Sequence, residues 1–378
     1  MDVHGSCEKG FEPVRDALVA NFEKGLEVGA SVCVTKDGET VVDLWAGDAD
    51  PAGTPWSADT IVNVYSTTKT MAATSVLVLA DRGLVDLDAP VARYWPEFAQ
   101  NGKENVLVRH VMSHSAGLSG FDPPIEKPEE LYDWHGACAR LAAQAPWWEP
   151  GTQSGYHAVT QGYLQGEIVR RVTGRSIGTF FREEVAEPLG ADFHIGLDAK
   201  HDHRVGELIP PRIGLGAAAA PAPGSVAART FAGYALTARE PQTRAWRAAE
   251  IPAAGGTGNA RSVARIHSAL ACGGAVDGVS LLSAAGVDRV LDEQTRGTDL
   301  VMGVPLVFGM GFGINDPSFP VSPNPRAFFW GGWGGSLAII DLDSRTSIAY
   351  VMNRMEADLM GDLRGGSIAA AVYQSLAA

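Results

Sequence analysis

The most informative stretch of the sequence is Val62-Asn63-Val64-Tyr65-Ser66-Thr67-Thr68-Lys69-Thr70-Met71-Ala72-Ala73, which continues through Arg82 to Gly83. It predicts a helix that begins near Ser66, since serine is a preferred residue at a helix N-terminus. Gly83 is well placed to end that helix, because glycine readily takes the left-handed conformation that follows a last helical turn. Apolar residues lie between these ends, at Met71, Val78 and Leu79. On this helix Ser66 and Lys69 are three residues apart, so their side chains share one face.

That spacing of serine and lysine has a chemical use. A serine hydroxyl is a weak nucleophile until a base removes its proton, and a lysine can be that base only while it is neutral. Burial and the partial positive charge of the helix N-terminus both lower the pKa of a lysine. The backbone N–H of Ser66 would also face a developing oxyanion at this helix end. The pair alone is common by chance and equally fits a surface helix with an ordinary serine cap.

Two later segments carry groups that an activated serine needs. Tyr156-His157-Ala158 follows the turn-rich loop Glu149 to Gly155 and precedes a helix predicted over Gln161 to Thr173, so Tyr156 can lie beside a lysine and pass protons. The run Phe328-Phe329-Trp330-Gly331-Gly332-Trp333-Gly334-Gly335-Ser336 enters a strand. Its glycines let a substrate lie close along the backbone, and an N–H there would be a second oxyanion donor.

The two ends of the chain carry the same elements. Near the N-terminus an amphipathic helix at residues 10–25 precedes two Val-rich strands at 30–35 and 40–46, whose connection contains an Asp-Gly turn. Near the C-terminus two strands, Ser336 to Asp341 and Thr346 to Met352, precede an alanine-rich helix at the end of the chain, residues 366–377. We therefore expect one antiparallel sheet built from both termini, with the two helices packed on it.

The middle of the chain has a different pattern. Residues 86–200 show few strand signals and several helical ones, such as Ser176 to Val185. The sequence thus predicts a discontinuous α/β domain of residues 1–85 together with 201–378, and a mostly helical domain of residues 86–200. Residues 213–228 carry no charge and are dominated by Ala, Gly and Pro, which predicts a surface connection or, alternatively, a lid over a site.

Composition and charge exclude several classes of protein. With 46% hydrophobic and 20% charged residues among 378, the chain is neither disordered nor fibrous. Its formal charge is −14 and it has no Lys/Arg-rich stretch, so nucleic acid is not an expected partner. No stretch reaches the roughly 18 apolar residues of a membrane span, and the N-terminus lacks the apolar core of a signal peptide. The four cysteines are widely spaced, so we expect a soluble, cytoplasmic protein that does not bind membranes.

The sequence offers no convincing metal or cofactor motif. His201-Asp202-His203 has two imidazoles, but nothing nearby supplies a third ligand, so an exposed polar turn is the favoured interpretation. Gly255-Gly256-Thr257-Gly258 lacks the lysine or the βαβ setting of a nucleotide-binding loop and is better explained as lining a cleft or turning the chain. We therefore expect no metal and no cofactor.

The order of Ser66-x-x-Lys69, Tyr156 and a later Gly-Gly strand resembles the serine β-lactamases and penicillin-binding proteins. Within that superfamily the chain is most similar to the class C β-lactamase-like carboxylesterases, called family VIII esterases. The likeness extends over nearly the whole chain and includes His110 to Leu118, Pro150 to Thr152 and Glu187 to Gly190. It implies an α/β fold of the α+β type, with the active site in the cleft between the sheet domain and the helical domain.

The resemblance also assigns roles to residues. Ser66 would be the acylated nucleophile, while Lys69 and Tyr156 would share the role of general base. Trp330-Gly331-Gly332 falls where β-lactamases have Lys-Thr-Gly, so these three residues would bind substrate. The backbone N–H groups of Ser66 and Trp333 would then form the oxyanion hole.

Several alternatives stay open at this point. The motif could instead be Trp333-Gly334-Gly335, although that register leaves few residues before the turn at Asp341. His157 would either contact substrate or point to solvent. His114 is a tempting base for a Ser-His-Asp hydrolase, but no G-x-S-x-G pentapeptide exists, and the family resemblance gives His114 a framework role.

Two departures from the β-lactamase pattern bear on the substrate. Trp330 has no charge at the position where β-lactamases place a lysine beside the substrate carboxylate. Ala158 stands where an Asn or Ser usually contacts the acyl amide. Both departures favour neutral esters, so we expect a serine carboxylesterase that hydrolyses neutral, short-to-medium-chain carboxylic esters.

Two other functions remain to be weighed against this one. The first is amide hydrolysis by a β-lactamase, D-peptidase or oligoamide hydrolase of the same fold. The second is a non-catalytic relative that binds ligands or acts as a scaffold, which would be free to lose Ser66, Lys69 or Tyr156, yet all three are present. The expected partner is a small-molecule ester, and the sequence leaves a homo-oligomer open.

Overall fold

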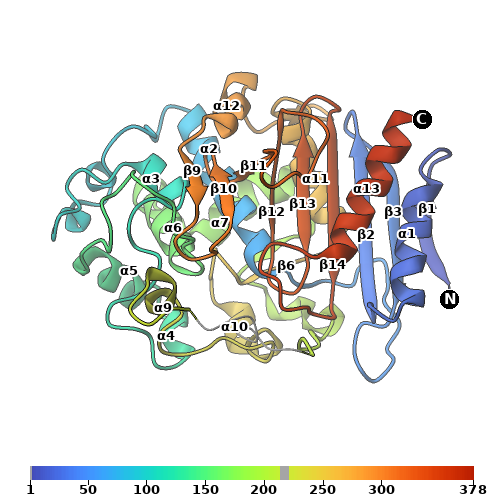
Figure 1. Ribbon diagram of the computed structural model, residues 1–378, viewed down its shortest axis with the longest axis horizontal. Helices are drawn as coiled ribbons and strands as arrows, with labels where there is room; N and C mark the ends of the chain where they lie inside the picture. The colour runs from blue at the N-terminus through green and yellow to red at the C-terminus, as the bar shows by residue number, and fades with distance from the viewer. Residues whose placement is uncertain (1, 213–220) are drawn as a thin grey trace.

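A large antiparallel sheet forms the frame of the protein in the computed structural model, which describes residues 2–212 and 221–378 (Figure 1). Its strands are β1 (Val3–Cys7), β2 (Gly29–Lys36), β3 (Glu39–Gly47), β9 (Thr295–Thr298), β10 (Pro305–Phe308), β11 (Gly313–Ile314), β12 (Ala327–Gly331), β13 (Leu337–Asp341) and β14 (Thr346–Met352). They lie side by side in the order β1-β3-β2-β14-β13-β12-β11-β10-β9. The N-terminal hairpin and the C-terminal strands therefore share one sheet, as the sequence predicts.

The predicted Asp-Gly hairpin joins β2 and β3. Asp37 has φ 52° and Gly38 has φ 90°, and two left-handed residues in a row match the twist of the strands that they connect. β2 pairs with β14 on its other edge, with Lys36 opposite Thr346 and Ala30 opposite Met352. This pairing closes the sheet between residues that lie more than 300 positions apart in the chain.

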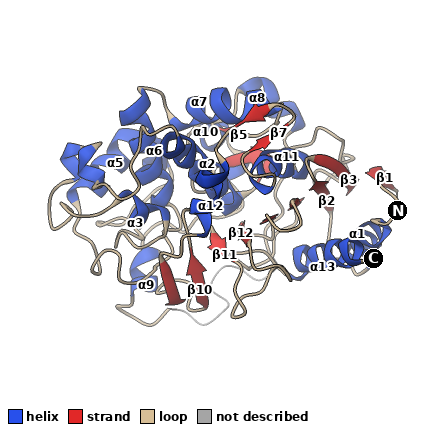
Figure 2. Ribbon diagram, turned by 90° about the horizontal axis from the view of Figure 1, so that it is seen from above, coloured by secondary structure: helices blue, strands red, loops and turns tan. Residues whose placement is uncertain are grey.

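Helices cover both faces of this sheet (Figure 2). α1 (Glu12–Glu23) and α13 (Leu363–Ala377) pack against each other on one face, and α11 (Ala260–Ala271) lies on the other. α1 buries the side chains at the positions that its periodicity predicts: Val14, Leu18 and Phe22. The expectation of an antiparallel sheet with terminal helices packed on it is confirmed.

The rest of the chain is mostly helical and is arranged around α2 (Thr68–Asp81). Every residue of α2 from Thr68 to Leu79 is buried, because α6 (Thr160–Thr173) and α7 (Ile177–Phe181) pack against it. Gly83, with φ 70°, follows the end of the helix as predicted. The other helices are α3 (Val108–Met112), α4 (Glu129–Tyr132), α5 (Trp134–Ala143), α8 (Glu187–Leu189), α9 (Val226–Thr230), α10 (Arg244–Ala248) and α12 (Ala284–Asp288).

Two small sheets complete the described structure. One contains β4 (Val62–Asn63), β6 (Gly256–Gly258) and β5 (His194–Ile195), and the other is the hairpin of β7 (Ala275–Val276) and β8 (Val279–Ser280). In the first, the N–H of Gly256 donates to Thr68 Oγ1 over 2.8 Å. A Cβ at Gly256 would lie 2.4 Å from that oxygen, so only glycine fits here. The glycine-rich segment at 255–258 is therefore a strand that supports the start of α2.

Some elements differ from the sequence-based expectations. The first turn of the Ser66 helix is a 3₁₀ turn, Tyr65–Thr67, so the α-helix starts at Thr68. The helix expected at Ser176 to Val185 is interrupted, because α7 passes into a π-helical turn at Arg182–Ala186 before α8. The sequence does not predict strands β1, β9, β10 and β11, because they have no alternating apolar pattern. β1 and β9 form the two edges of the sheet, and β10 and β11 lie between β9 and β12.

Three expectations need a separate comment. The domain boundaries at residues 86 and 200 stay a prediction. The proposed connection or lid at 213–228 falls partly on residues 213–220, which lie outside the described part of the chain. Within the described residues, no helix combines the length and the apolar character needed to cross a bilayer.

Candidate active site

Ser66 lies in the turn between β4 and α2. The turn begins with Tyr65 at φ 43°, a left-handed conformation that is uncommon for a residue with a side chain. Packing holds it there, because the Tyr65 ring is buried and its hydroxyl donates to the Thr237 carbonyl over 2.8 Å. Ser66 keeps 8% of its surface exposed, whereas Thr67 and Thr68 have none. Ser66 is thus the residue of this turn that a substrate can reach.

Lys69 lies one helical turn beyond Ser66 and is buried. Its Nζ is 3.2 Å from Ser66 Oγ, and it donates to the carbonyl oxygens of Ala158 and Ala253 over 2.7 and 2.9 Å. Burial lowers the pKa of Lys69 well below its ordinary value, and no carboxylate among the described residues opposes this. A neutral amine has two N–H donors and one lone pair. The two carbonyls take the donors, so the lone pair is left for the Ser66 hydroxyl proton.

Tyr156 completes the contact with the serine. Its hydroxyl donates to Ser66 Oγ over 2.6 Å, and its ring lies 4.7 Å from Lys69 Nζ. Burial raises the pKa of Tyr156 above its ordinary value, so the group is a phenol rather than a phenolate. The side chain of Asp299 fixes the backbone at Tyr156, since its Oδ1 accepts the backbone N–H of Tyr156 over 3.0 Å.

The turn between β12 and β13 lies directly against the Ser66 turn. Ser336 donates from its Oγ to the Val64 carbonyl over 2.9 Å and contacts Thr67 Oγ1 at 2.9 Å. A Cβ at Gly332 would lie 2.1 Å from the Val64 carbonyl oxygen and 3.2 Å from the Ser66 nitrogen. The absence of a side chain at Gly332 therefore allows the two turns to meet.

Two backbone N–H groups are free at this meeting point. Among the described residues, neither the N–H of Ser66 nor that of Trp333 has a backbone or side-chain acceptor. A donor without an acceptor is costly unless a ligand or water takes it. The pair is therefore available to the oxygen of a tetrahedral intermediate, which is the role the sequence predicts for it.

Trp330 lies beside Tyr156, with 5.3 Å between the ring centroids. It belongs to a small cluster of buried apolar side chains, separate from the main core, that contains Tyr156, Val301, Leu306, Phe308 and Trp330. Gly331 follows it at the end of β12. The run Trp330 to Trp333 thus places an indole beside the tyrosine and a free N–H beside the serine.

The expectation for His157 is corrected by the structure. Its side chain has no exposed surface, and both ring nitrogens are engaged by backbone groups. Nδ1 lies 2.6 Å from the Gly155 carbonyl, and Nε2 accepts the Leu118 N–H over 3.1 Å. Burial lowers the pKa of His157 to about 3, so the ring is neutral, and its side chain does not face solvent. His114 accepts the His157 N–H and belongs to the same framework.

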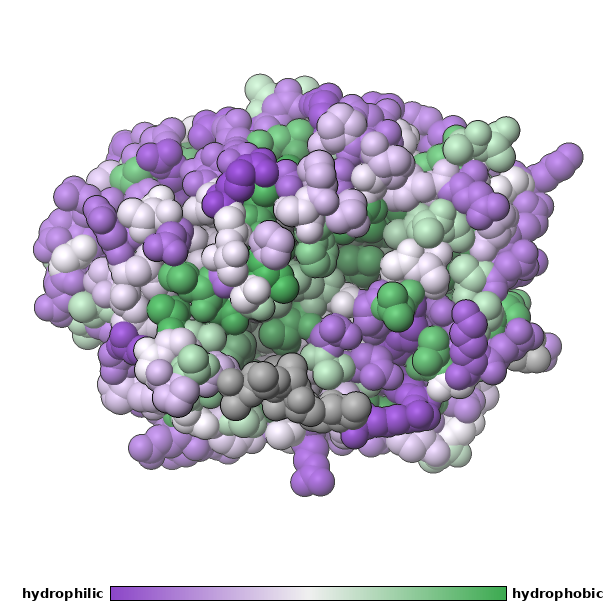
Figure 3. Space-filling view, viewed as in Figure 1, coloured by the Kyte–Doolittle hydropathy of each residue, from purple (hydrophilic) through white to green (hydrophobic). Residues whose placement is uncertain are grey.

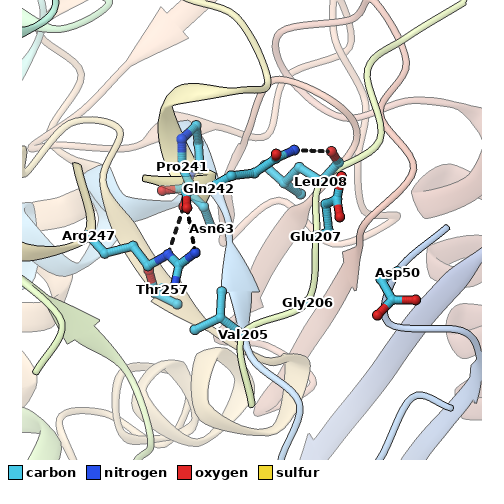
Figure 4. Close-up of a pocket in the computed structure, with 10 residues that line it drawn as sticks. All are labelled: Asp50, Asn63, Val205, Gly206, Glu207, Leu208, Pro241, Gln242, Arg247 and Thr257. Atoms are coloured by element: carbon cyan, nitrogen blue, oxygen red, sulfur yellow. Dashed lines mark hydrogen bonds between the residues drawn. The ribbon is translucent and has the colours of Figure 1, made fainter. Parts of the chain in front are cut away.

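A cavity of about 330 Å³ near β4 is distinct from this site (Figure 4). Asn63 and Thr257 line one side of it, while Asp50, Glu207 and Arg247 bring charges. The Arg247 guanidinium is bonded to the Pro241 and Gln242 carbonyls. Because none of Ser66, Lys69 and Tyr156 lines this cavity, we do not place the substrate there.

Sequence reasoning missed three groups that hold the site together. Ala253 acts through its backbone carbonyl, which leaves no trace in the sequence. Asp299 is an isolated acidic residue with no spacing signal. Ser336 ends a glycine run and begins a predicted strand, and neither pattern indicates its contacts with Val64 and Thr67. A serine that follows two glycines at the entry to a strand was the one available signal.

This combination of sheet order and side chains defines a serine hydrolase with a β-lactamase-like fold. The chain belongs to the Beta-lactamase family, whose model matches residues 16–372. It is 38% identical to "Esterase/beta-lactamase LipL" of Mycobacterium tuberculosis, over 95% of this chain and 84% of that protein.

Two solved structures agree with this assignment. A family VIII carboxylesterase is 45% identical to the chain with a TM-score of 0.93, over 99% of this chain and 100% of that one. A penicillin-binding protein homologue from Caulobacter crescentus is 42% identical with a TM-score of 0.92, over the same shares of the two chains. The resemblance to family VIII carboxylesterases is confirmed.

The lowered pKa of the Lys69 amine predicts how catalysis depends on pH. With the neutral amine of Lys69 as the predicted base, kcat/KM should rise with pH through the lowered pKa of Lys69. No alkaline decline should follow below pH 10.0, since burial holds the pKa of Tyr156 above that ordinary value. Lys69→Arg should lose about 100-fold to 10,000-fold in kcat, because a guanidinium stays protonated. A pH-rate profile without an acid limb, or an active arginine variant, would contradict this account.

The close approach at Gly332 predicts a second result. Gly332→Ala must push the turn away from Val64, and misplacing one oxyanion donor should lower kcat by about 100-fold or more. Gly366→Ala is the matched control, because a Cβ at that helical position meets no other atom within 4 Å. Steady-state kinetics with thermal unfolding of both variants checks the prediction, which fails if Gly332→Ala keeps the wild-type kcat.

Proposed function

We propose that this protein is a serine carboxylesterase that hydrolyses neutral, short-to-medium-chain esters through an acyl-enzyme on Ser66. One observation carries the proposal. Ser66 Oγ lies between an uncharged amine that can accept its proton and a phenol that can donate one, at 3.2 and 2.6 Å. An acid and a base on either side of one nucleophile are what both steps of acyl transfer need.

The roles of the groups follow from their protonation states. Lys69 takes the proton of Ser66 as Oγ attacks the ester carbonyl carbon, and the N–H groups of Ser66 and Trp333 hold the resulting oxyanion. When the tetrahedral intermediate collapses, the bond to the alcohol oxygen breaks and Tyr156 gives that oxygen a proton. The Lys69 ammonium returns its proton to Tyr156. Water then attacks the acyl carbon by the same route in reverse, which releases the acid and restores Ser66.

The surroundings of Ser66 support a neutral acyl group. Trp330 packs against Tyr156 with 5.3 Å between the ring centroids, and Phe308 packs against Trp330 with 5.2 Å between theirs. Figure 3 shows hydrophobic residues gathered in a hollow near the middle of this face, between the β9–β10 hairpin and β12. A wall of this kind binds hydrocarbon well and leaves a carboxylate without a partner.

Hydrolysis of β-lactams or other amides is the second candidate. It is favoured by the description of LipL as both an esterase and a β-lactamase. Against it, Ala158 offers only its backbone carbonyl, and Lys69 already occupies that oxygen. Esters also have the better leaving group. We propose that ester hydrolysis is the main activity and that amide cleavage is at most a side reaction.

We also propose a cytoplasmic location. The support is that the four cysteines are free, with Cys33 and Cys138 buried, as in proteins from a reducing compartment.

A substrate panel tests the proposed function. Aryl esters of acetate, butyrate, octanoate and laurate should be hydrolysed fastest at the shorter lengths, and a chromogenic cephalosporin much more slowly. An organophosphonate should add once to the wild type, as seen in the intact mass, and not to Ser66→Ala. Faster turnover of the cephalosporin, or labelling of the alanine variant, would overturn the assignment.

Trp330 predicts how the enzyme discriminates between substrates. Trp330→Lys introduces a cation beside Tyr156, and a charge-assisted hydrogen bond to a substrate carboxylate is worth about 1.5–3 kcal/mol, or roughly 10-fold to 100-fold. The ratio of kcat/KM for a carboxylated β-lactam to that for a neutral ester should rise by that factor. Trp330→Phe is the control that changes the ring without adding charge. An unchanged ratio in the lysine variant would show that Trp330 does not stand at the carboxylate position.

A further inference from the structure

A buried ion cluster lies behind the oxyanion turn and is not used by the mechanism above. Its centre is Arg364, in the first turn of α13, whose side chain is 2% exposed. The guanidinium contacts the carboxylates of Asp362 and Glu27, which are 7% and 0% exposed. The guanidinium and two acidic side chains are therefore removed from water in one place, and burial raises the pKa of Glu27 to about 7. Such clusters contribute little net stability, because desolvation offsets the attraction between the charges.

The cluster is attached to the backbone that carries Trp333. Arg364 Nη2 donates to the Gly334 carbonyl over 2.6 Å, and Nη1 donates to the Arg354 carbonyl over 2.8 Å. The Gly334 carbonyl also accepts the N–H of Glu356 over 3.1 Å. Arg364 thus ties together the oxyanion turn and the segment that follows β14.

Gly334 and Gly335 of this turn have backbone conformations and surroundings that leave room for the Arg364 side chain. Gly334 has φ 100° and Gly335 has φ 125°, conformations that favour glycine strongly. A Cβ at Gly335 would lie 2.5 Å from Arg364 Nη2 and 2.4 Å from Asp362 Oδ2. The second Gly-Gly pair of the sequence therefore provides room for the ion pair as well as the turn conformation.

Bonds on both sides of Trp333 determine where its N–H points. On one side the Gly332 N–H donates to the Ser336 carbonyl over 2.8 Å. On the other side the Gly334 N–H donates to the backbone carbonyl of Asp358, and the Gly334 carbonyl accepts a hydrogen bond from Arg364. The arginine supplies the side-chain anchor on that second side. The peptide group between Gly334 and Gly335, whose carbonyl Arg364 holds, also donates its Gly335 N–H to the Gly332 carbonyl over 3.1 Å. That carbonyl belongs to the same peptide group as the Trp333 N–H, so the arginine is linked to this N–H through one further hydrogen bond.

We propose that Arg364 is a positioning residue of the hydrolase: by fixing the Gly334 carbonyl it sets the direction of the Trp333 N–H in the oxyanion hole. The inference rests on the proposed function, because it takes Trp333 as an oxyanion donor. An oxyanion donor is effective only when it is held to within about 0.5 Å of the productive position. Arg364 acts through the turn and touches no reacting atom.

The test compares Arg364→Lys and Arg364→Met with the wild type on one aryl ester. Kcat should fall about 10-fold in the lysine variant, which keeps a single cationic donor nitrogen, and about 100-fold in the methionine variant, which keeps none. KM should change less than threefold in both variants. The Ki of a reversible arylboronic acid, which mimics the tetrahedral intermediate, should rise in parallel with the loss in kcat/KM. Active-site titration with an organophosphonate corrects each rate for the folded fraction.

Two further variants keep the test decisive. Asp362→Asn preserves the cap of α13, since Asn caps as well as Asp, but weakens the hold on the guanidinium, so kcat should fall severalfold at constant KM. Arg265→Lys is the matched control, because Arg265 also pairs with an aspartate, Asp277, and donates to a carbonyl, Leu189, away from the oxyanion turn. Its kcat should stay at the wild-type value.

The outcomes separate this inference from the proposed function. If wild-type ester hydrolysis survives Ser66→Ala, the proposed function is wrong. If hydrolysis depends on Ser66 while the folded Arg364 and Asp362 variants keep kcat and boronate affinity, the positioning role alone is wrong. A loss of kcat that boronate affinity does not follow also overturns it, since a general loosening would then explain the rate.

Discussion

The burial of the Lys69 amine without a counter-charge is the constraint around which the site is arranged. An ammonium in that position would carry a full charge where water is excluded. The desolvation free energy of that charge is unfavourable, so burial favours the neutral amine. The two carbonyl oxygens that receive its N–H groups come from different parts of the chain, Ala158 before α6 and Ala253 before β6. Two segments, those of Ala158 and Ala253, must therefore meet beside α2 before the amine is fully bonded, and α2 is buried from Thr68 to Leu79.

The oxyanion hole that we propose imposes a second constraint, because it requires the backbones of two turns to approach each other closely. The strands β12 and β13 carry their connecting turn up to the Ser66 turn, and contact is possible because Gly332 has no side chain and Ser336 bonds to the Val64 carbonyl. The sheet supplies a rigid base for this contact. Ser66 and Lys69, the proposed nucleophile and base, come from the start of α2, so the proposed reacting groups lie where this helix meets the turn between β12 and β13.

Much of this arrangement could be predicted from the sequence, and the remainder has physical reasons for escaping it. The spacing of Ser66 and Lys69, the hairpin at Asp37-Gly38 and the paired strands at both ends follow from local patterns. The role of Ala253 is a backbone contact that any residue could make, and His157 gave the wrong expectation because a histidine next to a reactive tyrosine looks the same in sequence whether it faces substrate or the core. Its neighbours, the Gly155 carbonyl and the Leu118 N–H, come together only in the folded chain.

The pairing of β2 with β14 has a consequence for how the protein reaches this state. A growing chain emerges N-terminus first, so the hairpin of β2 and β3 is complete long before its partner at Thr346–Met352 exists. Until then an apolar strand edge stays unpaired, and closing a contact across more than 300 residues is slow. The interval between synthesis and closure is therefore when this chain is most exposed to aggregation. We expect catalysis to begin only after this interval, because the turn that carries the proposed oxyanion donor Trp333 connects β12 and β13, which are synthesised late.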